Sequence, residues 1–321
     1  MAVRKVLLIG GSGFVGGWVA SRLSAAGVRV TIPTRRRENR KRLLLLPTVF
    51  EVQADVGDPQ TLAALVEGVD AVINLVGILH DRDDRAPYGA AFAAAHVDLP
   101  RRIVAAMRSA GVRRLLHMSA LAAANDAPSA YLRSKADGEA AVLDAAGELD
   151  VTVFRPSVIF GPGDAFLNTF AGLLRHLPVL PLVGGEARLQ PVFVGDVADA
   201  FVAALGDRDS FGRTYELGGP RVYTLRELVR YVADLGGHPR VLVDVPAGVA
   251  ALQARVLGWL PNPPLSPDNL RSLSVPSVTD GSRNPPAWQP HALEAVAPGY
   301  LTPLKLHQRL GFYRGRAGRS T

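Results

Sequence analysis

Short, unbroken apolar runs alternate with amphipathic stretches along the first half of the chain. The first run, residues 6–9, is four consecutive apolar residues, which is typical of a strand buried on both faces of a parallel sheet. Behind it, Val15, Val19 and Leu23 recur at helical spacing. Gly27 stands where a helix C-terminus favours a left-handed residue. This stretch therefore predicts a strand, a turn and a helix.

The same alternation continues as far as residue 155. Further strands are predicted at residues 28–32, 48–54, 70–76, 113–118 and 151–155, and helices at residues 59–67, 88–110 and 130–146. Asp58 is the predicted N-cap of the first of these helices, and Gly111 ends the second. Strands that alternate with helices imply right-handed crossovers. We therefore predict an α/β protein with a Rossmann-type doubly wound parallel sheet.

The rhythm changes after Pro156. Helices are predicted at residues 166–176 and 225–235, and Thr224 and Glu227 are spaced as a capping box for the second of them. A strand beginning at Val192 is predicted to return to the sheet and to be followed by a helix. We divide the chain into a main domain, residues 1–160 with a return of about 191–217 to the sheet, and a smaller C-terminal lobe. The lobe comprises residues 161–190 and 218–321, and we expect it to cover the carboxyl edge of the sheet, where substrates bind in such folds.

Composition narrows the class of protein. The chain has 321 residues, 48% hydrophobic and 20% charged, which is an ordinary globular composition. It has no cysteine, which excludes disulfides, thiolate metal sites and cysteine nucleophiles and fits a reducing cytoplasm; we assign no metal site. No apolar run reaches the roughly 18 residues that span a bilayer. Met1 directly precedes the first predicted strand, so we expect a cytoplasmic protein without a cleavable signal peptide.

The formal net charge is +7, and part of it is clustered. Basic residues gather in two groups, which are Arg35, Arg36, Arg37, Arg40, Lys41 and Arg42, and then Arg309, Arg314, Arg316 and Arg319. Such groups fit nucleic acid, an anionic membrane or an acidic partner, and they also fit a solvated basic surface. No zinc finger, RNA-binding pattern or recognition helix accompanies them, so we expect no nucleic-acid partner.

A glycine-rich turn joins the first strand to the first helix. Its residues are Gly10, Gly11, Ser12, Gly13, Phe14, Val15 and Gly16. Glycines allow a tight turn and a close backbone approach, and a helix N-terminus with free N–H groups favours a phosphate. Placed between this strand and this helix, the turn predicts a dinucleotide-binding site. The alternative is a tight turn that holds no ligand.

The residues after the second predicted strand indicate which dinucleotide is bound. The acidic residue expected about 20 positions beyond the glycines is replaced by Thr34, followed by Arg35 and Arg36. A hydroxyl and guanidinium groups suit a 2′-phosphate, which favours NADP(H) over NAD(H). The alternative is an exposed basic turn.

Two later strand ends offer weaker cofactor contacts. Asp55, followed by Val56, either accepts a hydrogen bond from the adenine amino group or caps a helix. Leu75, Val76 and Gly77 end the fourth strand, where a glycine lets the backbone approach the cofactor.

Tyr131 and Lys135 form the sharpest chemical pattern. Four residues apart, they share one face of a predicted helix. We expect the ammonium group of Lys135 to favour the phenolate form and to lower the pKa of Tyr131 toward a useful acid–base range. Lys135 is also a candidate for a hydrogen bond to the nicotinamide ribose.

Together these residues resemble the extended, epimerase/dehydratase-like branch of the short-chain dehydrogenase/reductase superfamily. The matching segments are 10–16, 55–56, 74–77, Ser119, 131–135 and 155–164. The resemblance implies catalytic roles for Ser119, Tyr131 and Lys135, and cofactor contacts that include Pro156 and Val158.

Within that branch, segments 33–37, 117–120, 166–168, 190–197 and 215–220 resemble the NADPH-binding accessory subunits of respiratory complex I and their bacterial relatives. This resemblance implies a respiratory complex I or quinone-related protein complex as partner. The absence of a mitochondrial presequence favours a bacterial member.

Two residues depart from the family pattern. Active extended enzymes place serine or threonine after the position of Ser119, where this chain has Ala120, and His96 replaces a usual asparagine. Two hypotheses follow. One is an NAD(P)-dependent oxidoreductase, epimerase or dehydratase that uses Tyr131 and Lys135 on a carbonyl, an alcohol or a sugar nucleotide. The other, which Ala120 favours, is an NADPH-binding accessory protein with little or no turnover.

A role in quinone metabolism is the remaining alternative. The apolar stripe within residues 247–260 fits either packing in the core, which we favour, or peripheral contact with the inner face of a bacterial membrane.

Overall fold

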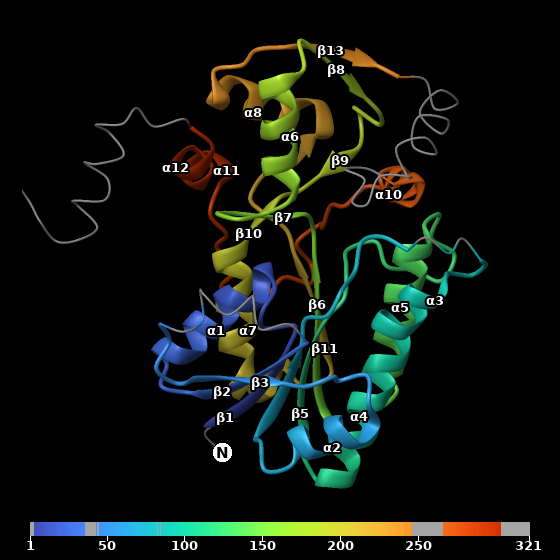
Figure 1. The fold of residues 1–321 in the computed structure, drawn as a ribbon, viewed down its shortest axis with the longest axis vertical. Helices are drawn as coiled ribbons and strands as arrows, with labels where there is room; N and C mark the ends of the chain where they lie inside the picture. Colours follow the sequence, from blue (N-terminus) through green and yellow to red (C-terminus); the bar gives the residue numbers. More distant parts are fainter. Residues whose placement is uncertain are drawn as a thin grey trace, which may run out of the picture.

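A seven-stranded parallel sheet forms the centre of the molecule (Figure 1). The computed structural model describes residues 3–35, 43, 45–81, 83, 85–245 and 266–302. In this part of the chain the strand order is β11-β6-β5-β4-β1-β2-β3. The strands are β1 (Lys5–Ile9), β2 (Arg29–Thr34), β3 (Val49–Gln53), β4 (Ala71–Asn74), β5 (Arg114–Met118), β6 (Asp150–Pro156) and β11 (Arg213–Leu217). The order reverses between β1 and β4, the kind of point where such sheets bind ligands. The predicted fold class is confirmed.

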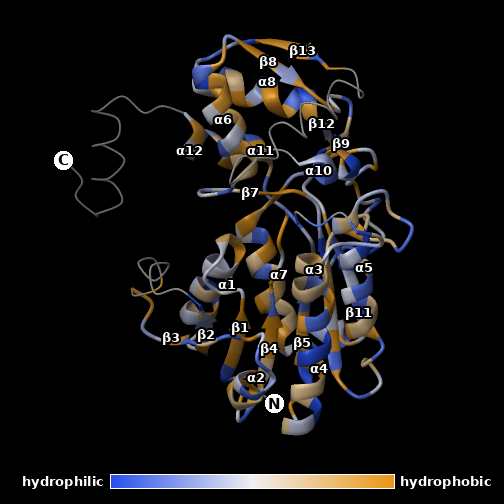
Figure 2. Cartoon of the chain, turned by 45° about the vertical axis from the view of Figure 1, so that its right-hand side comes forward, coloured by the Kyte–Doolittle hydropathy of each residue, from blue (hydrophilic) through white to orange (hydrophobic). Residues whose placement is uncertain are grey.

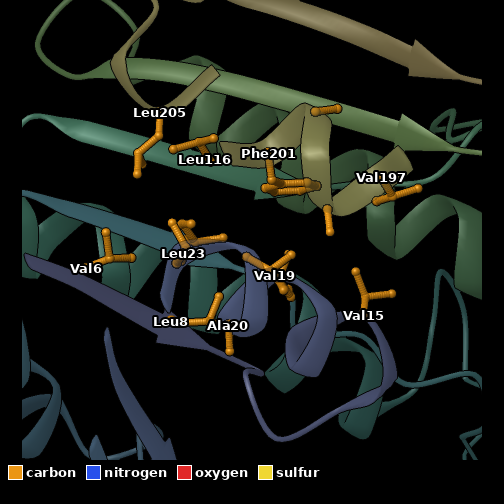
Figure 3. Packing of buried hydrophobic residues seen from close by; sticks show 14 of the residues in the cluster. Val6, Leu8, Val15, Val19, Ala20, Leu23, Leu116, Val197, Phe201 and Leu205 are labelled. Atoms are coloured by element: carbon orange, nitrogen blue, oxygen red, sulfur yellow. The ribbon is translucent and has the colours of Figure 1, made fainter. Parts of the chain in front are cut away.

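Both faces of the sheet are covered by helices. Val6 and Leu8 of β1 pack in one core cluster with α1 (Phe14–Ala25) and α7 (Val194–Gly206). Figure 3 shows Val19 and Leu23 of α1 opposite Phe201 of α7. Leu7 and Ile9 point to the other face, because successive side chains of a strand alternate. There they pack with α2 (Pro59–Val66), α4 (Leu99–Ala110) and α5 (Ala130–Leu143). This explains why β1 is apolar at consecutive positions.

The predicted helix at residues 88–110 is interrupted. It begins as α3 (Ala90–Phe92), continues as the π-helical turn η2 (Ala93–Asp98) and becomes α4, which ends at the left-handed Gly111. The π-helical turn lies against α5, because a Cβ atom on Gly138 would stand 1.8 Å from the carbonyl oxygen of His96. π-Helical turns inside helices often mark functional sites. Apolar spacing does not reveal such a turn, so the prediction of one regular helix is wrong here.

The predicted helix caps are confirmed. The side chain of Asp58 accepts a hydrogen bond from the amide of Thr61 at the start of α2. Thr224 and Glu227 form the capping box of α8 (Leu225–Gly236). The helix predicted at residues 166–176 is α6 (Phe166–His176).

With one exception, the remaining short elements lie beyond the carboxyl edge of the sheet (Figures 1 and 2). Three two-stranded sheets pair β7 with β10, β8 with β13 and β9 with β12. The strands are β7 (Ile159–Phe160), β8 (Val179–Leu182), β9 (Arg188–Leu189), β10 (Val192–Phe193), β12 (Tyr223–Thr224) and β13 (Val241–Asp244). The helices are η3 (Arg208–Ser210), α10 (Pro267–Ser272), α11 (Leu293–Val296) and α12 (Pro298–Leu301). Of these, η3 belongs with the main sheet, because it leads directly into β11.

The strand that begins at Val192 does not join the central sheet. It pairs with β7, and β11 is the strand that returns. Val192 is fully buried in the cluster formed by α1 and α7, so its apolar character suits the core without a place in the sheet. The prediction of a return at Val192 is therefore wrong.

Within the described ranges, no helix combines the length and apolar character needed to cross a bilayer. The apolar stripe of residues 247–260 and the arginines at positions 309–319 fall outside the described residues, as do positions 36, 37 and 40–42 of the first basic group.

Candidate functional site

The glycine-rich turn brings the backbone of β1 and α1 into close contact. Gly10 has a φ of +85°, and a Cβ atom on Gly16 would stand 2.3 Å from the carbonyl oxygen of Gly10. Gly13 is the N-cap of α1 and, having no side chain, provides no side-chain cap for the first amides of this helix. Those amides stand at the positive end of the helix dipole. The turn therefore has the geometry of a phosphate cradle that bulkier residues would fill, which fits a dinucleotide.

The end of β4 lies directly beside this turn. A Cβ atom on Gly10 would stand 3.1 Å from the backbone of Leu75 and Val76. Gly77 follows and is exposed, and a Cβ atom there would lie 3.8 Å from Lys135 Nζ. The structure thus brings together the glycine turn, the end of β4 and α5, which the sequence separates by more than 100 residues.

Thr34 and Asp55 stand at the ends of the neighbouring strands β2 and β3. Thr34 is buried, with 6% of its surface exposed, and its carbonyl oxygen accepts a hydrogen bond from the amide of Ala54 at 3.2 Å. Asp55 is exposed, followed by the half-buried Val56, and its Oδ1 accepts the amide of Gly57 at 2.9 Å. Arg35 is exposed beyond β2, and Arg36 falls outside the described residues.

Lys135 is directed at the end of β5. Its Nζ donates a hydrogen bond to the carbonyl oxygen of Met118 at 2.7 Å, and the residue is 2% exposed. Burial penalises the ammonium form and lowers the pKa of Lys135 to about 8. Met118 directly precedes Ser119 in the chain, so Lys135 and Ser119 lie at the same strand end.

Tyr131 does not show the predicted pKa shift. Its ring contacts His96 and Phe92, with centroid distances of 5.6 and 6.2 Å. Burial raises the pKa of Tyr131 to about 12, because the phenolate loses its hydration. The expected lowering of the pKa of Tyr131 by Lys135 is therefore wrong. The ammonium group of Lys135 is instead hydrogen-bonded to the carbonyl oxygen of Met118.

Ser119 has an unused hydroxyl group. It is 2% exposed, and its Oγ has no hydrogen-bond partner among the residues that the structure describes. Its amide bonds the carbonyl oxygen of Phe154 at 2.8 Å, which fixes the end of β5 against β6. Ala120 follows, buried in a small apolar cluster against which Tyr131 packs. A buried hydroxyl without a partner is costly in a folded protein, so this group is suited to a ligand.

His96 connects the loop after β4 to α5. Its Nε2 accepts a hydrogen bond from the amide of Ile78 at 3.0 Å, and its Nδ1 lies 2.8 Å from Ser134 Oγ. Because Nε2 is an acceptor, the proton of the neutral ring belongs on Nδ1, which donates to Ser134. Burial lowers the pKa of His96 to about 2. His96 therefore acts as a neutral structural bridge, with both ring nitrogens occupied.

Two polar residues of the matching segments, to which the sequence assigned no role of their own, stand at adjacent strand ends. Asn74 of β4 and His117 of β5 are opposite each other, and Asn74 Nδ2 lies 3.2 Å from His117 Nδ1. Asn74 Oδ1 accepts the amide of Val76 at 3.2 Å, which orients the backbone beside the glycine turn. The sequence signal that could have identified them is a polar side chain within an otherwise apolar strand.

Pro156 is the last residue of β6, and Val158 follows two positions later. The carbonyl oxygen of Pro156 accepts the amide of Leu121 at 3.0 Å, and that of Val158 accepts the amide of Val192 at 3.0 Å. These bonds hold the loop after β5 and the strand β10 at the carboxyl edge of the sheet, above which the second lobe lies.

The chain is similar to proteins of known family. The family model described as "NAD dependent epimerase/dehydratase family" matches residues 6–218. Subunit 9 of the NADH dehydrogenase [ubiquinone] 1 alpha subcomplex of Arabidopsis thaliana is 33% identical over 262 residues, which cover 79% of this chain and 63% of that protein. This chain thus spans less than two thirds of that relative's length.

A second relative matches over almost its whole length. The (4-alkanoyl-5-oxo-2,5-dihydrofuran-3-yl)methyl phosphate reductase of Streptomyces griseus is 30% identical over 311 residues, covering 91% of this chain and 99% of that protein. Among solved structures, MoeE5 in complex with UDP-glucuronic acid and NAD superposes with a TM-score of 0.64 at 22% identity, over 75% of this chain and 85% of MoeE5. That similarity shows the shared fold.

Proposed function

The chain belongs to the NAD-dependent epimerase/dehydratase family of extended short-chain dehydrogenases/reductases, and from this we propose that it binds NADP(H) at residues 10–16. The observation that carries the proposal is the cradle formed by Gly10 and Gly16, which any side chain would fill. The family binds an NAD(P) dinucleotide, whose pyrophosphate lies at the glycine turn in such folds. Residues 34–36 and 55–56 would hold the adenosine end, and residues 75–77, Tyr131, Lys135, Pro156 and Val158 the nicotinamide end.

The preference for NADP(H) over NAD(H) is supported by Thr34 and Arg35, at the end of β2. The acidic residue that would bond a ribose 2′-hydroxyl is absent there, and Arg35 is exposed and able to approach a phosphate. We expect replacement of Arg35 and Arg36 by alanine to weaken NADPH binding by roughly tenfold or more, equivalent to about 1.4 kcal/mol, and to spare NADH. Calorimetric titration of both dinucleotides measures this. A similar loss of affinity for both would contradict the assigned preference.

We propose that the bound dinucleotide is held rather than turned over, in a protein that resembles a complex I accessory subunit. Three features support this: Ala120 removes one hydroxyl, Tyr131 has a raised pKa, and the ammonium group of Lys135 is bonded to Met118. A ligand that binds the native state stabilises it by mass action, so dinucleotide and fold would support each other. The relative from Arabidopsis is named as a subunit of NADH dehydrogenase, which supports a respiratory or quinone-related complex as partner, at the inner face of a membrane.

A reductase is the second candidate, favoured by the partnerless hydroxyl of Ser119. In this mechanism Ser119 would donate a hydrogen bond to a substrate carbonyl oxygen and Tyr131 would give it a proton. Lys135 would stabilise the resulting phenolate, and bound NADPH would supply the hydride. The second lobe would supply the substrate contacts. The Streptomyces relative is named a reductase and matches over nearly its full length, which supports this alternative.

The two candidates differ in whether NADPH is consumed. We expect the purified protein, loaded with NADPH, to show a raised melting temperature and no oxidation of the dinucleotide when quinones or small carbonyl compounds are added. Absorbance of the reduced nicotinamide follows the reaction. Turnover that disappears in Tyr131→Phe would instead establish the reductase.

A further inference from the structure

The short helix α10 of the C-terminal lobe touches the first turn of α5, above which it lies in Figure 1. Asp268 Oδ1 accepts a hydrogen bond from the amide of Ala130 at 2.8 Å, and its Oδ2 accepts the amide of Tyr131 at 2.9 Å. Asp268 stands 137 positions beyond Tyr131 in sequence. The carboxylate therefore links the lobe to the turn that carries the candidate acid–base residue.

This contact is additional to the ordinary cap of α5. The side chain of Ser129 already accepts the amide of Leu132 at 3.2 Å, as an N-cap does. The amides of Ala130 and Tyr131 would otherwise have no intrahelical partner. The side chain of Asp268 is 14% exposed, so water has little access to replace it. A negative charge at this helix end is also stabilised by the helix dipole.

The position of α10 is itself fixed on both sides. Ser266 and Asn269 form a capping box at its start. Asn269 Nδ2 donates to the carbonyl oxygen of Leu79, in the loop after β4, at 3.3 Å. Ser272 donates to Ser129 Oγ at 2.9 Å. The helix is thus bonded to the loop after β4 and to α5, the two segments that flank the proposed nicotinamide end.

We propose that Asp268 is a positioning residue for Tyr131. By holding the Tyr131 amide, it fixes the first turn of α5, while His96 and Phe92 contact the ring from η2 and α3. Asp268 also pairs with Arg271 of the same helix, with Oδ1 3.3 Å from Nη1. This role rests on the proposed function, in which Tyr131 helps to hold the nicotinamide end of the dinucleotide.

A double-mutant cycle tests whether Asp268 acts through the hydroxyl of Tyr131. NADPH affinity is measured for wild type, Asp268→Ala, Tyr131→Phe and the double variant. We expect Asp268→Ala to weaken binding by about fivefold in the wild-type background, the effect of losing one hydrogen bond. In the Tyr131→Phe background we expect Asp268→Ala to weaken NADPH binding by less than about twofold, because the hydroxyl through which Asp268 acts is already absent.

Equal weakening by Asp268→Ala in both backgrounds, or none in either, would overturn the positioning role. Failure of the wild-type protein to bind NADPH would overturn the proposed function and this role with it, and that result appears before any variant is measured. Should Asp268→Ala not fold, Asp268→Asn takes its place in the cycle, since the amide keeps one acceptor oxygen.

Thr224→Ala is the matched control for a purely structural effect. It removes a helix cap of similar kind from α8 of the same lobe, where the Thr224 hydroxyl accepts a hydrogen bond from the amide of Glu227. We expect it to leave NADPH affinity unchanged. In Asp268→Ala, the rate of backbone amide hydrogen exchange should rise by roughly tenfold at residues 130–132. In Thr224→Ala, the exchange rate should rise at the start of α8. A loss of NADPH affinity in Thr224→Ala equal to that in Asp268→Ala would assign the effect to general destabilisation and overturn the role.

Discussion

Replacement of Gly16 by alanine is expected to reduce NADPH affinity by roughly 100-fold, equivalent to about 2.7 kcal/mol. The added Cβ atom would stand 2.3 Å from the carbonyl oxygen of Gly10 and 2.5 Å from Gly11 Cα. Both neighbours are backbone atoms, which cannot rotate away as a side chain does. The turn must therefore separate from α1, and the phosphate cradle opens. Titration with NADPH measures the loss, and thermal unfolding without the ligand measures the accompanying destabilisation.

Gly17 provides the matched control in the same helix. A Cβ atom there meets nothing within 4 Å. Because alanine forms helices better than glycine, Gly17→Ala should keep NADPH affinity and raise stability by about 0.5–1 kcal/mol. Normal NADPH binding by Gly16→Ala would show that the close approach of α1 to the turn is unnecessary.

Replacement of Glu139 by alanine is expected to lower the free energy of unfolding by about 3 kcal/mol. Glu139 of α5 forms a bidentate ion pair with Arg155 of β6. Its Oε1 lies 2.7 Å from Arg155 Nη2, and its Oε2 lies 2.9 Å from Arg155 Nε. The carboxylate side chain is 4% exposed and that of Arg155 is 23% exposed. Removal of one partner leaves a largely buried charge without compensation. Urea unfolding of the wild type and of Glu139→Ala, each with and without NADPH, measures the difference in the free energy of unfolding.

The exposed pair of Arg108 and Glu148 is the comparison. Its side chains are 45% and 64% exposed, so Glu148→Ala should cost less than about 1 kcal/mol. Equal losses from Glu139→Ala and Glu148→Ala would contradict the structural importance of the buried pair.

The parts of the fold that sequence predicts well are those with one dominant cause. The strand at β1 is apolar at consecutive positions because both of its faces are covered, and the caps at Asp58 and Thr224 follow from local hydrogen bonding. The glycine turn is recognised because Gly10 and Gly16 meet conditions that only glycine satisfies. In each case the local pattern and the folded environment agree.

The features that sequence did not predict depend on contacts between distant segments. The π-helical turn at His96 reflects close packing against Gly138 of α5. The raised pKa of Tyr131 reflects burial, which no spacing of residues reports. Asp268 reaches α5 across 137 positions. The pairing of β10 with β7 could not be predicted either, because two consecutive apolar residues fit a buried core position and a strand of the central sheet equally well.

Equilibrium titration of the purified wild-type chain with NADPH and with NADH is the most direct test that this protein holds NADP(H) in the glycine cradle. Saturable binding of one NADPH per chain is predicted, at least roughly tenfold tighter than that of NADH, a difference of about 1.4 kcal/mol. Absence of saturable binding by either dinucleotide would contradict it.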